Sequence, residues 1–181
     1  MGRLFGLFLI ATLLPACAPR LAQVSQTLTQ KSAGTVAVLP FQGPQGDVFA
    51  GRVGYELLRN GASVVARDRV AALLQERALQ TTRFGPNAPL ARVLALGKAL
   101  KADTVVVGSV ESPGPGNSVL DKLRGFSGEP VTAAAIRFVR VADGSTVSYA
   151  SYRPERDVPL LRDDSHKVAR KLIEAVFANG P

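Results

Sequence analysis

The stretch TVVVGSV, residues Thr104 to Val110, decides the fold. It is a near-continuous run of β-branched and apolar residues, a pattern typical of a strand that is buried on both faces. A second run of the same kind, TVAVLPF, covers Thr35 to Phe41. Strands with two buried faces need helices packed on the sheet, so the sequence predicts an α/β fold.

Four segments around these runs have apolar residues at helical spacing. One ends at Asn60-Gly61, a helix stop, and the next follows Asp68, a good N-cap. A third covers Leu90 to Leu100, and Asp163 or Asp164 caps the last. The residues expected to be buried are, in chain order, Val48, Phe49, Val53, Leu57 and Leu58; Val70, Leu73, Leu74 and Leu79; Leu90, Val93, Leu94 and Leu100; and Val168, Leu172, Ile173, Val176 and Phe177.

Three further strands complete the predicted domain. Ser63 to Ala66 is a short strand, while Val131 to Val141 and Thr146 to Tyr152 form a hairpin around Asp143-Gly144. The apolar phase shifts along the first hairpin strand, which indicates either that both faces are covered or that a bulge is present. The expected order is β-α-β-α-α-β-β-β-α in one domain, residues 35–178. Its helices pack on a mixed sheet in two or three layers.

The N-terminus reads as a processing segment. Met1 to Arg3 carries one positive charge, and Leu4 to Leu14 is an apolar run of 11 residues. That run is much shorter than the ~20 residues of a membrane-spanning helix but fits an export signal. We expect residues 1–16 to be the signal and residues 17–34, which are small and polar, to be a flexible tether.

Cys17 is the only cysteine and His166 the only histidine. An intramolecular disulfide is therefore impossible, and the usual zinc cluster is excluded. The residues Leu14, Pro15, Ala16 and Cys17 resemble the lipobox of bacterial lipoproteins. That resemblance implies cleavage before Cys17, a diacylglycerol on its thiol and acylation of the new amine. The alternative is a general secretory signal that leaves a free thiol.

The lipobox resemblance also implies a location in the cell envelope. Ala18 stands where some lipoproteins retained in the inner membrane carry Asp, so we expect the periplasmic face of the outer membrane. Two or three acyl chains make a stable anchor, because each buried CH₂ contributes ~0.8 kcal/mol. No other cofactor is expected.

The chain is basic, with 22 Lys and Arg against 14 Asp and Glu, and 16 of the cations are Arg. These cations are spread along the chain without a block of five, whereas nucleic-acid binders gather them on one face. We therefore expect no nucleic-acid partner. The charges either form a solvated surface or meet anionic lipid headgroups or cell-wall carboxylates.

An ordered set of segments resembles the CsgG family, the curli-secretion lipoproteins. It also resembles the related domain of the outer-membrane lipoprotein that activates a penicillin-binding protein. The segments are VAVLPF at Val36 to Phe41, VVARDRVAALLQERAL at Val64 to Leu79, KADTVVVGSV at Lys101 to Val110 and IRFVRVADGSTVSYAS at Ile136 to Ser151. The resemblance implies a cell-wall synthase or a secretion component as partner, and ring assembly as a homo-oligomer.

Curli-secretion subunits also add membrane-spanning hairpins to this domain. Each such hairpin needs two strands of ~9 to 11 residues with alternating apolar side chains. Residues 112–130 contain three prolines and four glycines, and residues 153–164 number only 12. Proline cannot donate to a strand ladder, so neither segment fits. We expect the periplasmic domain without the pore.

No catalytic constellation is visible. His166 has the setting of a solvated surface residue, and GPQGDVFAG at Gly43 to Gly51 lacks the Gly-Lys-Ser/Thr ending of a phosphate loop. Asp103 and Glu111 lie at opposite ends of a strand, ~26 Å apart, too far for shared acid–base chemistry. The sequence therefore predicts no catalytic, cofactor or metal site.

The favoured function is that of an accessory or adaptor lipoprotein in cell-envelope assembly. Its candidate docking residues lie in the Pro/Gly-rich loop of residues 112–130: Leu120, Leu123, Arg124 and Phe126. That loop is equally well read as a disordered insertion. The alternatives are a ring-forming subunit of a secretion or motility apparatus and an envelope hydrolase with an unrecognised site.

The lipobox interpretation predicts that Cys17→Ser releases the protein from the membrane. Without the thiol no acyl chain is attached, and the anchor is lost. Membrane fractionation with an antibody against the domain measures the effect, with Ser112→Ala as the control. Co-sedimentation of Cys17→Ser with the outer membrane at the native level would show that this interpretation is wrong.

Overall fold

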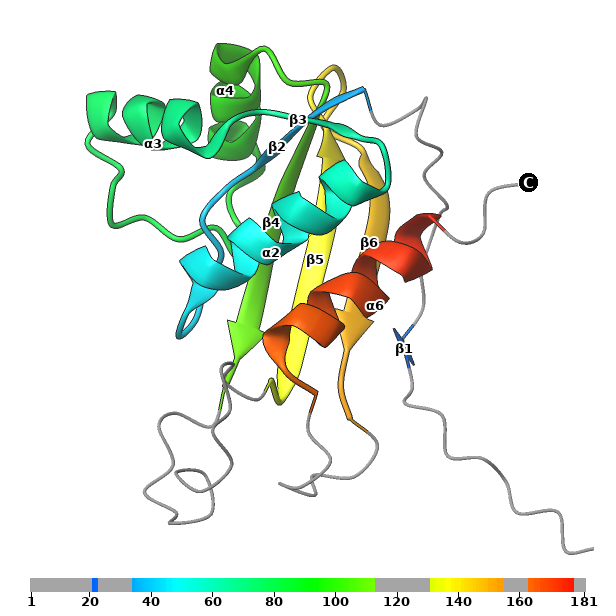
Figure 1. Ribbon diagram of the computed structural model, residues 1–181. Helices are drawn as coiled ribbons and strands as arrows, with labels where there is room; N and C mark the ends of the chain where they lie inside the picture. Colours follow the sequence, from blue (N-terminus) through cyan, green and yellow to red (C-terminus); the bar gives the residue numbers. More distant parts are fainter. Residues whose placement is uncertain (1–20, 23–33, 113–130, 155–162, 178–181) are drawn as a thin grey trace, which may run out of the picture.

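The computed structural model describes residues 21–22, 34–112, 131–154 and 163–177 (Figure 1). In that part of the chain, four helices pack on five strands, with the two-residue β1 added at one edge. This confirms the predicted element order. The elements are β1 (Leu21–Ala22), β2 (Thr35–Val38), α2 (Gly46–Arg59), β3 (Ser63–Val64), α3 (Arg67–Glu76), α4 (Leu90–Leu100), β4 (Thr104–Glu111), β5 (Ala133–Arg140), β6 (Thr146–Tyr152) and α6 (Ser165–Phe177).

The sheet is mixed, with the strand order β1-β6-β5-β4-β2-β3. β2 runs parallel to both β3 and β4, whereas β5 is antiparallel to β4 and β6. Val106 on β4 lies between Val38 on β2 and Phe138 on β5. The strand that the TVVVGSV run predicts is therefore the centre of the sheet.

Two apolar cores, one on each face of the sheet, make three layers. α2 and α6 lie side by side across one face (Figure 1), and Val106 and Val110 of β4 pack into that core. α3 and α4 cover part of the other face, where Val105 and Val107 are buried. Consecutive β4 residues thus enter opposite cores, and this explains why the strand has no polar alternation.

The hairpin prediction is confirmed. The shift in its apolar pattern has both of the predicted explanations, a bulge and apolar cores on both faces of the strand. A register irregularity separates Phe138 from Val139. Phe138 packs in the α2–α6 core and Val139 in the other. Gly144 has φ +75°, and the Ser145 hydroxyl and amide both donate to Asp143 Oδ1, which lowers the pKa of that carboxyl.

Two local predictions about helix and strand ends are wrong. Asp68 is not the N-cap of α3: Ala66 holds that position, and Asp68 Oδ1 accepts a hydrogen bond from the Arg69 amide. The short strand ends at Val64 rather than at Ala66. The chain leaves the sheet there because α3 begins at Arg67. Of the two caps predicted for α6, Asp163 and Asp164, the second holds that role: its Oδ1 accepts a hydrogen bond from the Lys167 amide at 2.8 Å.

Three residues expected in the core are exposed instead. Val48 and Leu58 on α2 and Leu90 at the start of α4 have exposed side chains. Apolar residues at helical spacing form a broad stripe along a helix, and only the residues at the centre of that stripe pack on the sheet. Leu79 follows the end of α3 and is partly buried against the second core. Phe84, in the segment between α3 and α4, is also buried in that core.

The close approach of α4 to the sheet predicts a stability difference between two helical glycines. A Cβ at Gly97 would lie 2.6 Å from Val141 Cγ2 and 2.7 Å from Val105 Cγ2. At Gly54 on α2 the nearest atom, Val38 Cγ2, would be 3.9 Å away. Gly54→Ala should therefore raise the free energy of unfolding by about 0.5–1 kcal/mol through helix propensity. Gly97→Ala should lower it by about 1 kcal/mol, because overpacking outweighs that gain.

Urea unfolding followed by circular dichroism measures both variants. The matched pair removes the helix-propensity contribution from the comparison. Equal stabilisation by the two substitutions would contradict the tight contact between α4 and the sheet.

Candidate interaction surface on helices α2 and α6

The site residues predicted from the sequence lie outside the described residues. This holds for Leu14, Pro15, Ala16 and Cys17 and for Leu120, Leu123, Arg124 and Phe126. The lipid anchor and the docking loop therefore stay predictions. Within the described ranges, none of the helices combines the length and the apolar character required to span a bilayer.

Apolar side chains are exposed along the outer face of α2. Val48, Tyr55 and Leu58 are 49%, 53% and 56% exposed, whereas Phe49, Val53 and Leu57 of the same helix are buried. In the described part of the chain the other large exposed hydrophobic residue is Leu90, at the start of α4. α2 thus has a buried apolar face and an exposed apolar stripe, and only the first is needed for folding.

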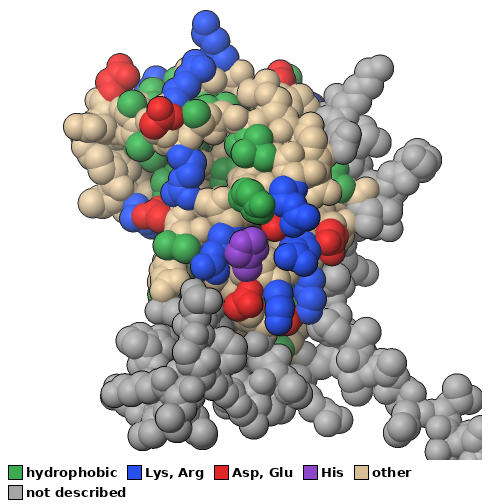
Figure 2. Space-filling model, in the orientation of Figure 1, with side chains coloured by type: hydrophobic (Ala, Val, Ile, Leu, Met, Phe, Trp, Pro, Cys, Tyr) green, Lys and Arg blue, Asp and Glu red, His purple; other side chains and the backbone are tan. Residues whose placement is uncertain are grey.

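Tyr55 lies at the centre of this surface. The guanidinium of Arg59 is 6.0 Å from the centroid of its ring, and the His166 ring meets it edge-on, also at 6.0 Å between centroids. In Figure 2 the histidine lies on the α2–α6 face among apolar, basic and acidic side chains. We call the outer side chains of Val48, Tyr55, Leu58, Arg59 and His166 the α2–α6 surface.

A buried carboxyl group lies beneath the α2–α6 surface. Glu56 is 1% exposed, and its Oε2 is 3.4 Å from Arg59 Nη1. Its Oε1 is 3.6 Å from His166 Nδ1 and has no hydrogen-bond partner among the described residues. The expectation of an isolated solvated histidine is therefore incomplete: His166 is half exposed but faces a carboxyl group. Glu56 on α2 and His166 on α6 are far apart in the sequence, and no local pattern connects them.

Asp163 fixes the start of α6 against the sheet. Its Oδ2 accepts hydrogen bonds from the Tyr152 hydroxyl on β6, at 2.9 Å, and from Lys171 Nζ on α6. Its carbonyl accepts from the Val131 amide. Burial alone would raise the pKa of Asp163, but the hydrogen bonds and the Lys171 charge outweigh it and hold the pKa below 3.8. Burial and the bond to Asp163 raise the pKa of Tyr152.

Charged side chains of both signs surround the α2–α6 surface. Lys167 and Arg170 on α6 are exposed, in addition to Arg59 on α2, and so is the carboxylate of Glu174 on α6. Asp163 is paired with Lys171, and Asp164 caps α6. The surface therefore combines an aromatic and aliphatic centre with charged edges, and it favours a partner surface of complementary charge.

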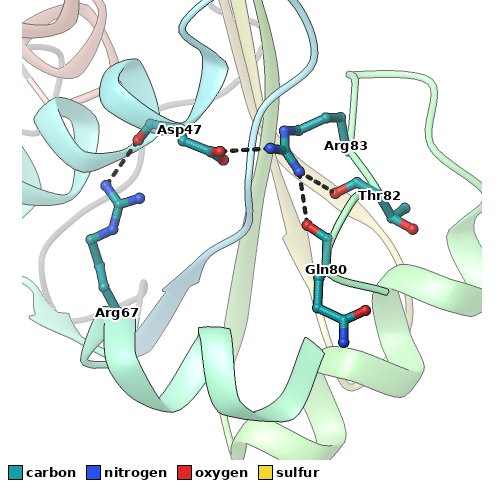
Figure 3. A network of polar contacts seen from close by, with 5 residues as sticks. All are labelled: Asp47, Arg67, Gln80, Thr82 and Arg83. Atoms are coloured by element: carbon teal, nitrogen blue, oxygen red, sulfur yellow. Dashed lines mark hydrogen bonds and ion pairs between the residues drawn. The ribbon is translucent and has the colours of Figure 1, made fainter. Parts of the chain in front are cut away.

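On the other side of α2, a groove of about 510 Å³ separates it from α3. Apolar side chains line it, among them Val64, Val70 and Leu74. Its rim is a polar network (Figure 3): Arg67 Nη1 donates to the Asp47 carbonyl at 2.9 Å, and Arg83 Nη2 to Asp47 Oδ2 at 2.7 Å.

The network ties α2 to α3 and to the segment after α3. Arg83 Nη1 also donates to the carbonyls of Gln80 and Thr82, at 3.1 and 3.3 Å. Both arginines thus have protein partners, and the network braces the two helices.

Metal ligation has no basis in the described residues, where no group of three or more His, Cys, Asp or Glu side chains could hold an ion. The one histidine of the α2–α6 surface, His166, faces the carboxyl group of Glu56 beneath it.

No protein-family model matches the chain, and no curated protein matches it in sequence. Solved structures are similar in fold. The PelC dodecamer of Paraburkholderia phytofirmans has a TM-score of 0.51 at 19% identity, covering 88% of this chain and 94% of that chain. Lipoprotein GNA1162 of Neisseria meningitidis has a TM-score of 0.48 at 16% identity, with 81% and 99% covered. The C-terminal domain of LpoB from Salmonella enterica has a TM-score of 0.45 at 11% identity, and the match covers 67% of this chain and 83% of that chain.

At these identities the comparisons establish the α/β fold alone. The resemblance to curli-secretion lipoproteins and to a synthase activator therefore stays a prediction from the sequence.

The contacts of Asp163 predict a pH-dependent contribution to stability. A carboxyl group whose pKa is lower in the folded than in the unfolded protein stabilises the fold. This stabilisation is complete at pH values above the unfolded pKa of ~3.9, and it is lost as the pH falls through the pKa of the folded protein. Asp163→Asn should lower the free energy of unfolding by about 1–2 kcal/mol at pH 7. The difference from the native protein should shrink as the pH falls below ~4.

Urea unfolding at several pH values measures this difference, and Glu174→Gln, at an exposed position of the same helix, serves as the control. A difference that is the same at pH 3 and pH 7 would contradict the role given to Asp163.

Proposed function

We propose that this protein is a non-enzymatic lipoprotein, held at the periplasmic face of the outer membrane by lipid on Cys17. Its α/β domain docks another envelope protein through the α2–α6 surface. The observation that carries the proposal is the exposure of Tyr55 and Leu58 on α2. Other apolar side chains of the same helix already pack in the core of the domain. Folding gains nothing from this exposure.

The composition of the α2–α6 surface fits the centre of a protein interface. Binding energy concentrates in a few residues, with Tyr and Arg enriched, and surrounding contacts exclude water from them. Tyr55 contacts the Arg59 guanidinium and the His166 ring, and these contacts favour the side-chain position seen here, which reduces the entropy lost on binding. A complementary partner presents a shallow apolar recess with charged groups at its edge.

The resemblance to envelope lipoproteins supplies the partner class. A cell-wall synthase or a component of a secretion or surface-structure complex is the expected partner. The Pro/Gly-rich loop can extend the contact, because Val131, just after it, bonds to Asp163 at the start of α6. Leu120, Leu123, Arg124 and Phe126 stay the proposed second set of contacts.

Self-assembly is the second candidate, and the dodecameric state of PelC, which shares the fold, favours it. In that case the chain forms a ring for secretion or motility, and the surface docks a second copy of the chain. A mass measurement of the full-length protein in mild detergent separates the two: a monomer or dimer supports the adaptor, and a ring of many copies supports self-assembly.

The double substitution Tyr55→Ala, Leu58→Ala should weaken partner capture at least tenfold. Loss of two central side chains removes more than ~1.4 kcal/mol of binding free energy. The readout is the amount of partner that crosslinks to and copurifies with the intact lipidated protein. Leu90→Ala is the matched control, because Leu90 is 43% exposed and belongs to α4 on the other face.

Deletion of residues 112–130, studied in parallel, tests the loop separately from the helices. Undiminished capture by the Tyr55→Ala, Leu58→Ala protein, or an equal loss with Leu90→Ala, would contradict docking through the α2–α6 surface.

A further inference from the structure

The second face of the sheet is only partly covered by helices, and Arg137 lies at the boundary of the covered part. Its neighbours across the strands are Val107 on β4 and Tyr149 on β6. Val107 is buried in the core under α3 and α4, as are Val139 further along β5 and Val141 just after that strand. Arg137 is therefore the residue at which this face changes from apolar core to polar surface.

Arg137 is partly exposed, but one edge of its guanidinium is buried without partners in the described part of the chain. Its Nε and Nη2 are buried, and neither has a hydrogen-bond partner among the described residues. Burial lowers the pKa of Arg137. Buried N–H donors without partners cost free energy, and an anion that accepts from both would remove that cost. Nε and Nη2 form one edge of the guanidinium, the edge that pairs two parallel N–H groups with a carboxylate.

Arg137 lines a groove of about 560 Å³ at one end of the sheet. This volume is typical of sites for small ligands. Gln42 follows β2, and Ser109 and Glu111 lie near the end of β4, so the groove lies at the carboxyl ends of two parallel strands. The helix that follows β2, α2, lies on one face of the sheet. The helices that precede β4, α3 and α4, lie on the other face. In α/β sheets this crevice is where ligands bind.

The charges at the groove limit the class of ligand. Arg137 is the one cation among its described lining residues, and Glu111, which is exposed, is the one carboxylate. A monoanion is balanced by Arg137, whereas phosphate near pH 7 brings a second negative charge that no cation matches. The side chains of Gln42, Asn87, Ser109 and Tyr149 can donate to or accept from amide groups next to the anion.

We propose that this groove binds the carboxylate of a peptide, with Arg137 as its anchor. A rotation of the side chain turns the Nε–Nη2 edge toward the groove, and the amide and hydroxyl groups of the walls contact the adjoining peptide backbone. The site is separate from the α2–α6 surface and does not depend on docking there.

The test is an NMR titration of the full-length protein in detergent micelles. The reporters are the Arg137 Nε–Hε signal and the backbone amides of Ser109 and Tyr149. Four probes are compared: N-acetyl-Ala-Ala with a free carboxyl end, the same peptide as its amide, N-acetyl-Asp-Ala amide and inorganic phosphate. We expect saturable shifts with a carboxylate probe, and at least tenfold weaker effects with the uncharged amide and with phosphate.

The first and third probes separate a terminal carboxylate from a side-chain carboxylate as the source of the anion. Arg137→Lys keeps the charge but cannot donate two parallel hydrogen bonds to a carboxylate. The probe concentration at half-maximal amide shift should therefore rise at least tenfold. Arg137→Gln should abolish saturation. The control is Arg140→Gln on the same strand, because Arg140 is 46% exposed and paired with Asp143.

The native protein alone decides the main point, so the proposal does not depend on the folding of a variant. Absence of saturable shifts with both carboxylate probes would overturn it. Equal affinity for the uncharged amide or for phosphate would overturn the assignment of a carboxylate. Unchanged affinity in a folded Arg137→Gln protein would remove Arg137 as the anchor.

Discussion

The burial of β4 on both faces is the constraint from which the rest of the structure follows. Val106 and Val110 need one apolar layer, and Val105 and Val107 need another. Helices must therefore cover both sides of the sheet, and the parallel pairing of β2 with β4 requires a crossover. α2 begins that crossover, and α3 and α4 complete it on the opposite face.

The same constraint separates residues needed for folding from residues left for other purposes. On one face α2 and α6 cover the sheet, and their inward side chains complete the core. Tyr55 and Leu58 have no part in it, which is why they carry the argument for docking. On the other face two helices cover only part of the sheet. Arg137 occupies the place where their cover ends, and its unpaired edge follows from that position.

The element order, the hairpin and the cap at Asp164 could be predicted because each depends on local signals. The bounds of β6, Thr146–Tyr152, are those that the alternation predicts. Burial on α2 was less predictable, since helical spacing marks Val48 and Leu58 as apolar without saying which of them reaches the sheet. Asp68 is within the first turn, where an acidic residue is favourable without being the cap. The pairing of Glu56 with His166 and the partnerless edge of Arg137 depend on tertiary packing, which no local pattern encodes.

Site-specific photocrosslinking in intact cells tests the central claim most directly, namely that the outer face of α2 docks another protein. A benzophenone side chain replaces Tyr55 in one variant and Leu90 in another, both in the full-length protein. The account predicts a discrete adduct with a polypeptide from position 55 and none from position 90. No adduct from position 55, or one from position 90 alone, would contradict it.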